Sequence, residues 1–142
     1  RTVFDSFNNG YYAGLNNSDE LFIQESNLIK DLADKESCVI VGRCADFILK
    51  DKRNVLKIFV SSSMENKIKR ATEFYHMDKE NAEKEIARIN KLRSNHYEYY
   101  TERGWETPSN YDICVNSDSI GINNVVDLIC SIVEKSKELA IK

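Results

Sequence analysis

The apolar residues of the chain fall into short runs and into longer stretches with helical spacing. Runs at residues 38–41, 55–60 and 111–115 predict β-strands, and the first reads as buried on both faces because it has no polar alternation. Helical spacing is found at residues 18–35, 62–75, 78–100 and 123–140. Strands that alternate with helices predict the α/β class, a parallel sheet with crossover helices, in which ligands bind beyond the carboxyl ends of the strands.

Polar residues mark where the predicted helices begin. Ser62 and Glu65 have the spacing of a capping box, and Asp78 is placed to cap the long helix that follows. Residues 1–16 are rich in Asn and Gly and are predicted to be irregular loop. The chain opens in a polar stretch without the features of a signal peptide, so we expect it to be part of a longer protein.

Composition narrows the class of protein. The chain has 142 residues, 42% hydrophobic and 30% charged, which is typical of one soluble domain, and no apolar run approaches the roughly 20 residues of a membrane span. The four cysteines lack metal-ligand spacing, and two of them lie inside apolar runs, which predicts small buried thiols in a cytoplasmic, reducing compartment. The net charge of −3 hides a basic middle, since residues 43–103 hold 14 Lys/Arg against 10 Asp/Glu. Such a stretch indicates either a solvated helical surface or an anion site.

Arg43 directly follows the first predicted strand, where a sheet of this class places its ligands. Gly42 before it allows backbone or ligand to approach closely. A planar, permanently charged guanidinium suits a phosphate held by two parallel hydrogen bonds. The alternative is an arginine that leaves the strand end to pair with Asp46, and the sequence favours neither. Asp46 is placed either to hold Arg43 or to accept a hydrogen bond from a ligand.

Two polar side chains share the apolar stripe of the long predicted helix. At 100° per residue, Asn90 and Arg93 fall within an arc about 100° wide together with the apolar and aromatic residues Ala82, Ile86, Ile89, Tyr97 and Tyr100. A buried guanidinium without a partner is costly, so Arg93 is expected to meet a carboxylate, an open crevice or an anionic ligand. Arg88 on the opposite side and Arg70 on the preceding helix are either surface charges or part of the same crevice.

Several ordered motifs carry a resemblance to a known family. The chain resembles the cytidylate kinase-like family, relatives of bacterial CMP kinase among the P-loop nucleoside monophosphate kinases, through CVIVGRCADFIL, KIFVSS with the following MENKIKR, INKLRSNHYEYYT and GWETPSNYDICVNS. The resemblance spans about residues 18–142. It implies a three-layer parallel sheet and a single partial kinase domain over residues 1–142, with a helical lid-like region at about 62–104.

The activity that the resemblance implies is transfer of the ATP γ-phosphoryl group, with Mg²⁺, to a nucleoside monophosphate such as CMP or dCMP. This chemistry depends on positioning and charge neutralisation, so arginines rather than a nucleophile are expected to dominate the site. The substrate-binding residues would be Gly42, Arg43, Asp46 and Asn90. The catalytic arginines would be Arg93, Arg88 and Arg70, the last two closing over the donor phosphates. Neither nucleic acid nor a membrane is an expected partner, no metal ligand is assigned, and a homo-oligomer stays open.

Two positions depart from the pattern of the family. CMP kinases carry Asp directly after Gly-Arg and again in Asp-x-x-Arg, where this chain has Cys44 and Asn90. A neutral Asn90 cannot form an ion pair with Arg93 or select cytosine in the same way, so base specificity is open. Asp46 is placed to replace the first carboxylate.

A third departure concerns the donor phosphates. The chain has no GxxxxGK[ST] or looser glycine-rich strand–loop–helix, whose backbone N–H groups cradle phosphates. In the family the strand of that element lies between the strands that correspond to residues 38–41 and 55–60, so these two are expected to lose their shared neighbour. We infer that an N-terminal segment is missing and expect this chain alone to be inactive. The alternatives are a noncatalytic nucleotide-binding or regulatory module, and an interaction domain without a ligand.

Overall fold

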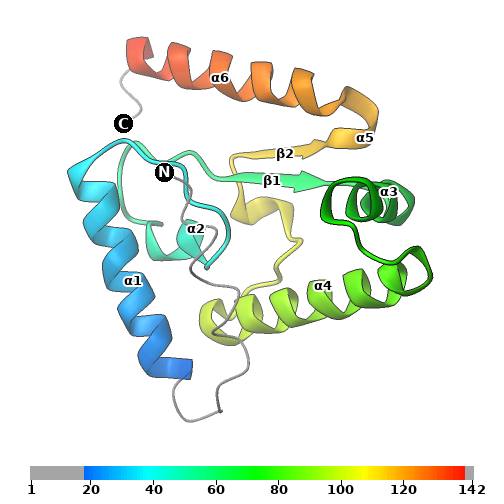
Figure 1. Cartoon of the computed structure of the whole chain (residues 1–142). Coiled ribbons are helices and arrows are strands. Elements are labelled where there is room, and N and C mark those ends of the chain that lie inside the picture. The colour runs from blue at the N-terminus through cyan, green and yellow to red at the C-terminus, as the bar shows by residue number, and fades with distance from the viewer. Residues whose placement is uncertain (1–17, 140–142) are drawn as a thin grey trace. The chain divides into compact units, whose positions relative to one another are not determined.

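The computed structural model describes residues 18–139, and the loop predicted for residues 1–16 lies outside them. The chain divides into two compact units, Arg1–Lys52 and Arg53–Lys142, and Figure 1 labels their helices and strands. Helices and a parallel pair of strands together confirm the mixed α/β class. Across the described residues, no helix combines the length and the apolar character that crossing a membrane requires.

The first unit contains a long and a short helix that pack against each other. Helix α1, Ser18–Lys35, has acidic residues in its first turn and Lys35 in its last, which suits the helix dipole. Its buried side is marked by Glu25 and Ile29. Helix α2, Ala45–Ile48, is a single turn that buries its first residue and is followed by buried Leu49. The sequence predicted α1 with its observed bounds but did not predict α2.

The strand predicted at residues 38–41 is not formed. These residues have no regular secondary structure, and Val39 and Val41 are 91% and 62% exposed. The apolar run has the composition of a buried strand, but a strand exists only when a neighbour completes its hydrogen bonds. No described strand of the first unit is available to do so. The prediction was therefore wrong for the described structure. The exposed valines show that the run lacks a neighbouring strand and a covering layer among the described residues.

The second unit is built on two parallel strands. Strand β1, Ile58–Ser61, pairs with β2, Ile113–Asn116, in a register that sets Ile58 opposite Ile113 and Ser61 opposite Asn116. Both strands begin two or three residues later than predicted, because the residues before them are joined by a different contact. There the backbone N–H of Lys57 donates to the Asp112 carboxylate at 2.8 Å. Within the described residues the sheet has two strands, so the three-layer sheet that the resemblance implies is seen only in part.

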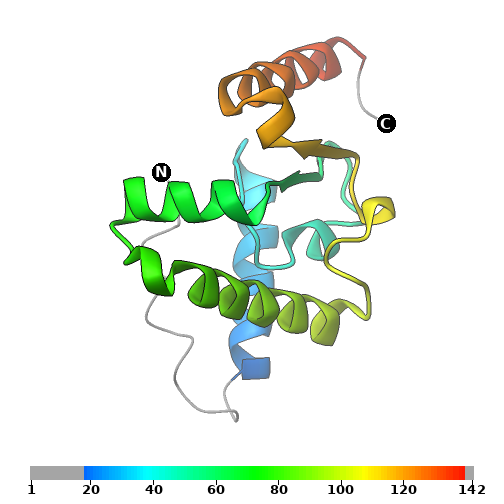
Figure 2. The same cartoon turned by 90° about the vertical axis from the view of Figure 1, so that its right-hand side faces the viewer.

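Helices α3, Met64–Tyr75, and α4, Lys79–Thr101, form a hairpin that follows β1 (Figure 2). The chain turns between them at His76, which ends α3 in a left-handed conformation. Asp78 caps α4 as predicted. The start of α3 differs from the prediction, because the cap is Ser63, whose hydroxyl accepts the Asn66 N–H at 3.2 Å. Ser62, expected to be the cap, contacts Asp118 instead.

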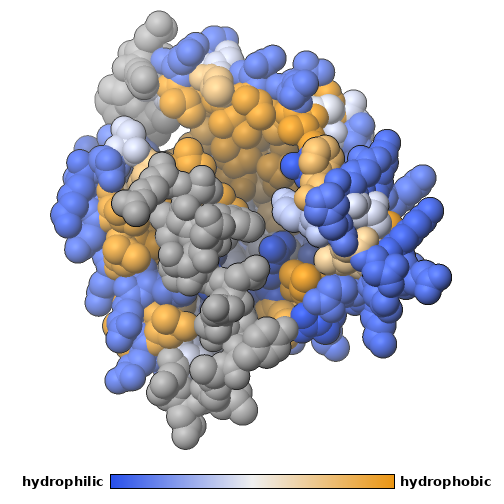
Figure 3. Space-filling view, viewed as in Figure 1, coloured by the Kyte–Doolittle hydropathy of each residue, from blue (hydrophilic) through white to orange (hydrophobic). Residues whose placement is uncertain are grey.

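The chain after α4 returns to the sheet and then covers it. A 3₁₀ turn, Pro108–Asn110, leads into β2, and the single-turn helix α5, Ser117–Ile120, follows directly. The last helix, α6, Ile122–Leu139, runs above the sheet in Figures 1 and 2 and buries Val125. Apolar surface below α6 is visible in Figure 3, and β1 keeps Val60 half exposed. The apolar covering of this small sheet is therefore incomplete among the described residues.

Candidate functional site

Gly42, Arg43 and Cys44 form a turn of three consecutive left-handed residues. Their φ angles are 69°, 57° and 55°. Only Gly adopts such angles readily, and for other residues the conformation costs roughly 1–2 kcal/mol each. The turn is closed by a hydrogen bond from the Ala45 N–H to the Gly42 carbonyl at 3.1 Å and leads into α2. Strained residues of this kind cluster at functional sites, so the turn is a candidate on structural grounds as well.

The Arg43 side chain is paired with Glu25 of helix α1. A terminal guanidinium nitrogen of Arg43 lies 3.3 Å from Glu25 Oε1, and the two side chains are 19% and 7% exposed. The two alternatives from the sequence were a ligand-binding arginine and one paired with Asp46. The structure shows a carboxylate partner for Arg43 that was not predicted, Glu25. Asp46 is half-buried at the start of α2 in the same unit.

The electrostatics of Glu25 are set mainly by its burial. Burial raises the pKa of its carboxyl group, and the nearby Arg43 charge opposes that rise. Oε1 is buried and receives no hydrogen bond from the described residues, so its contact with Arg43 is that of two charges and not a formed hydrogen bond. An acceptor of this kind is expensive to leave without a donor. The pair therefore holds the guanidinium in place while Glu25 keeps the capacity to accept a hydrogen bond.

Cys44 beside this pair is an inert thiol. Burial, with the Asp46 and Glu25 charges adding to it and Arg43 opposing it, raises the pKa of Cys44 to about 12. The reactive form of cysteine is the thiolate, which such a pKa suppresses near neutral pH. The turn thus offers a positioned guanidinium and a carboxylate, but no nucleophile.

The residues predicted on the long helix lie on α4 of the second unit. Ala82 and Tyr97 are buried and confirm the apolar stripe, and Asn90 is half-buried within it. Arg93 is exposed, so its guanidinium needs no buried partner. Its side chain is long enough to leave the edge of the stripe for water.

Arg88 and Arg70 each have a partner on their own helix. Arg88 forms a two-pronged pair with Glu85 one turn away, with its Nε and a terminal nitrogen at 2.9 and 2.5 Å from the two carboxylate oxygens. Those hydrogen bonds lower the pKa of the exposed Glu85 carboxyl group. The Arg70 guanidinium lies over the Phe74 ring, 5.1 Å from its centre. The hairpin thus carries all three predicted catalytic arginines, whereas Gly42, Arg43 and Asp46 belong to the first unit.

Two hollows of the surface lie in the first unit. One, of about 240 Å³, opens between α1 and α2 and is lined by Phe22, Ser26, Lys30, Phe47, Ile48, Lys50 and Asp51. A second, of about 350 Å³, shares Lys30, Ile48 and Asp51 with it. The linings of these two hollows include neither Arg43 nor Glu25, so neither hollow contains the paired side chains. Residues 18–139 contain no group of three His, Cys, Asp or Glu side chains arranged to hold a metal ion.

Two residues with a role in these contacts, Glu25 and Asp118, were not predicted from the sequence. Glu25 interrupts the apolar stripe of its helix in the way Arg93 interrupts the stripe of α4, which was a usable signal for a buried carboxylate. Asp118 follows the last strand by two residues, and its two contacts join residues 56 and 55 positions apart. No local pattern identifies such a contact.

Comparison with known proteins agrees with the resemblance in the sequence. A model of the cytidylate kinase-like family matches residues 1–119. The crystal structure of an uncharacterized protein from Eubacterium ventriosum is similar, with a TM-score of 0.75 and 30% identity. The match covers 82% of this chain and 66% of that one, so this chain spans just under two thirds of its solved relative. No curated protein matches the chain.

Proposed function

The chain belongs to the cytidylate kinase-like family, and on that premise we propose that the complete protein transfers the γ-phosphoryl group of ATP to a nucleoside monophosphate, CMP or dCMP. Because the chain spans 66% of its solved relative, the activity belongs to the whole protein. The proposal includes the three-layer parallel sheet of the P-loop kinases, completed by a strand, a phosphate-binding loop and a helix that this sequence does not contain. It also includes a cytoplasmic location.

The observation that carries the proposal is the fixed guanidinium of Arg43. It is held by the buried Glu25 and projects from a strained turn of three left-handed residues. A planar donor group that is immobilised before the ligand arrives loses little conformational entropy on binding a phosphate. Structural pairing alone would not require the strained backbone, whereas presenting a guanidinium to a ligand gives a reason for it.

In the proposed reaction an oxygen of the acceptor phosphate attacks the γ-phosphorus of ATP, and ADP leaves in line with it. Arg43 offsets the negative charge of the acceptor, which otherwise repels the incoming donor. Arg70, Arg88 and Arg93 stabilise the charge that develops on the transferred group. Asp46 and Asn90 contact the acceptor nucleoside, and Glu25 orients Arg43.

Mg²⁺ enters this proposal as the companion of ATP, where it neutralises phosphate charge. The described residues hold no cluster of metal ligands that fits the ion. We therefore assign no side chain of this chain to it.

A noncatalytic nucleotide-binding module is the second candidate. It is favoured by Asn90, which cannot pair ionically with Arg93, and by the bonding of Arg88 to Glu85 on its own helix. Such a module would bind the monophosphate through Arg43 without turning it over.

The test is a coupled assay of ATP consumption by the full-length protein with CMP, dCMP, UMP and AMP, beside calorimetric binding of each monophosphate. We expect turnover with a cytosine nucleotide. Arg43→Lys keeps the charge beside Glu25 but loses the planar fork, so it should weaken monophosphate binding more than about tenfold while the protein stays folded. Arg53→Lys, at an exposed arginine, is the matched control. Binding without turnover supports the second candidate. If the protein shows no binding and no turnover, both candidates are rejected.

A further inference from the structure

The carboxyl ends of the two strands meet in a polar junction within the second unit. Ser61 and Asn116 end β1 and β2 and lie opposite each other in the register. The Ser61 hydroxyl donates to the Val115 carbonyl at 3.1 Å, and the Ser117 hydroxyl donates to the Ser61 carbonyl at 3.0 Å. The strand ends are therefore joined by side chains as well as by the ladder.

Asp118 of α5 extends this junction to the start of α3. Its Oδ1 accepts the Ser62 hydroxyl at 2.7 Å, and its Oδ2 accepts the backbone N–H of Ser63 at 2.6 Å. Ser63 is the cap of α3, so both carboxylate oxygens hold the two residues that directly precede this helix. Asp118 is itself oriented, because its N–H donates to the Asn116 side chain at 2.9 Å.

The charge of the carboxylate is part of this contact. The Ser63 N–H, followed by the Ser62 hydroxyl, lowers the pKa of Asp118 to about 2. The carboxylate also faces the positive end of the α3 dipole. The group is therefore ionised wherever the protein is folded near neutral pH.

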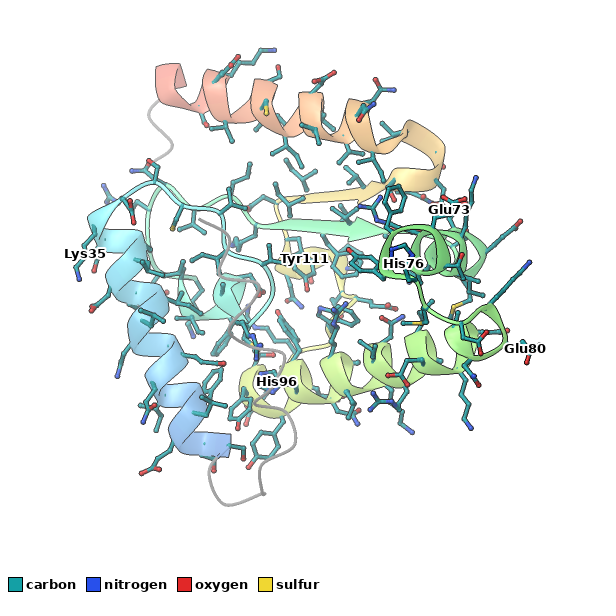
Figure 4. All side chains as sticks on the ribbon, in the orientation of Figure 1. Lys35, Glu73, His76, Glu80, His96 and Tyr111 are labelled. Atoms are coloured by element: carbon teal, nitrogen blue, oxygen red, sulfur yellow. The ribbon has the colours of Figure 1, made fainter. Side chains whose placement is uncertain are left out.

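The segment that follows α4 is held to the sheet by a contact of another kind. The centre of the Phe59 ring of β1 lies 5.9 Å from the ring centre of Trp105 and 5.0 Å from that of Tyr111. Trp105 and Tyr111 belong to the segment between α4 and β2, and Tyr111 is labelled in Figure 4. The Tyr111 hydroxyl donates to the Trp105 carbonyl at 2.5 Å. The hairpin is thus fixed by an aromatic contact after α4 and by Asp118 before α3. The Asp118 contact can be weakened without opening the aromatic cluster.

We propose that Asp118 is a positioning residue for the α3–α4 hairpin, holding the start of α3 against the strand ends and so setting where Arg70, Arg88 and Arg93 lie during phosphoryl transfer. The part about phosphoryl transfer rests on the proposed function. The anchor, by which we mean the contacts of Asp118 with Ser62 and Ser63, does not depend on the proposed function.

An amide cannot replace the carboxylate in this role. Asp118→Asn keeps one acceptor oxygen and puts an NH₂ group, a donor, against one of the two donors from Ser62 and Ser63. Asp127→Asn, on an exposed part of α6, removes the same charge without touching the junction and is the matched control.

Hydrogen–deuterium exchange of the full-length protein tests the anchor. Asp118→Asn should speed exchange in the first turns of α3 about tenfold and leave β2 and α6 as in the wild type. The Asp127→Asn control should show wild-type exchange in α3. Ser62→Ala, which removes one of the two contacts, should lie between and serves if Asp118→Asn does not fold. Unchanged exchange in α3 in both junction variants would overturn the anchor.

Phosphotransfer kinetics test the positioning role. Asp118→Asn should lower kcat about tenfold while the KM for the acceptor changes less than about twofold, because Arg43 and its turn are untouched. Faster exchange with unchanged kcat would show that Asp118 holds the helix without positioning the arginines, against the proposal. If the wild-type protein turns over no monophosphate, the proposed function fails and the clause on transfer falls with it. The exchange result still decides the anchor.

Discussion

Arg43 and Glu25 depend on each other for stability. The Glu25 side chain is 7% exposed, so without Arg43 its charge would remain where little water reaches it. We expect Arg43→Ala to lower the free energy of unfolding by about 3 kcal/mol, measured by urea denaturation. Adding Glu25→Gln should restore part of the loss, because the buried charge is then gone. A double variant no more stable than Arg43→Ala alone would show that the loss comes from packing.

The pH dependence of this effect follows from the direction of the Glu25 shift. Burial raises the pKa of Glu25 in the folded protein and Arg43 opposes the rise, so Arg43→Ala should raise it further. A carboxyl group with a raised folded pKa binds its proton more tightly in the folded state. Its contribution to stability is present at low pH and is lost as pH rises through that pKa. The cost of Arg43→Ala should therefore be larger at pH 8 than at pH 4.

Asp118 gives the opposite pH dependence. Its pKa falls from the usual 3.8 to about 2 in the folded protein, through the Ser63 and Ser62 hydrogen bonds. The contribution of the ionised form is fully present above about pH 4 and is lost as pH falls toward 2. We expect Asp118→Asn to flatten the fall in melting temperature between pH 4 and pH 2.5, followed by circular dichroism. A wild-type slope in this variant, with Asp127→Asn as control, would contradict the assignment.

Helix α4 depends on one small residue for its packing. Ala82 is fully buried, and Ala87, five residues further on, is exposed. Ala82→Leu adds atoms where the interior is filled and should cost about 2 kcal/mol of unfolding free energy. Ala87→Leu, the same change on the outer face, should stay within about 0.5 kcal/mol. Equal effects of the two variants in denaturant titrations would mean that α4 does not pack through Ala82.

Elements with a local signal, such as a cap or a repeating apolar stripe, were predictable from the sequence. Elements that depend on contacts with distant parts of the chain were not. Helix α4 was placed to within a residue at each end, because Asp78 caps it and the stripe repeats over many turns. Helices α2 and α5 have four residues each, too few for a repeat. Residues 38–41 have the right composition for a strand, but pairing depends on a neighbour that local sequence does not reveal.

The candidate site shows the same division. Arg43 was found because it follows an apolar run and a glycine, both of which are visible locally. The left-handed conformation of Arg43 and Cys44 was not predictable, because neither residue favours it. Glu25 and Asp118 reach their partners through tertiary packing. The sequence therefore identified the residue that the site presents, and the structure supplied the residues that hold it.

For the whole molecule, the exposed strand material leads to a last prediction. Two parallel strands make a marginal sheet, and parallel sheets are normally covered on both faces. Yet Val39 is 91% exposed, Val60 is 51% exposed, and Cys38 presents an exposed thiol. If the complete protein supplies the strand proposed here, the run at residues 38–41 becomes an interior strand.

Maleimide labelling followed by mass spectrometry can measure this change. Cys38 should react at least about tenfold more slowly in the longer protein than in residues 1–142, because opening of a paired strand must precede reaction. Cys130, exposed on α6 away from Val125 and Ile129, should react at the same rate in both and controls for the reagent. Equal labelling of Cys38 in the two proteins would mean that residues 38–41 stay a loop, and the three-layer sheet would have to be abandoned even with the family assignment intact.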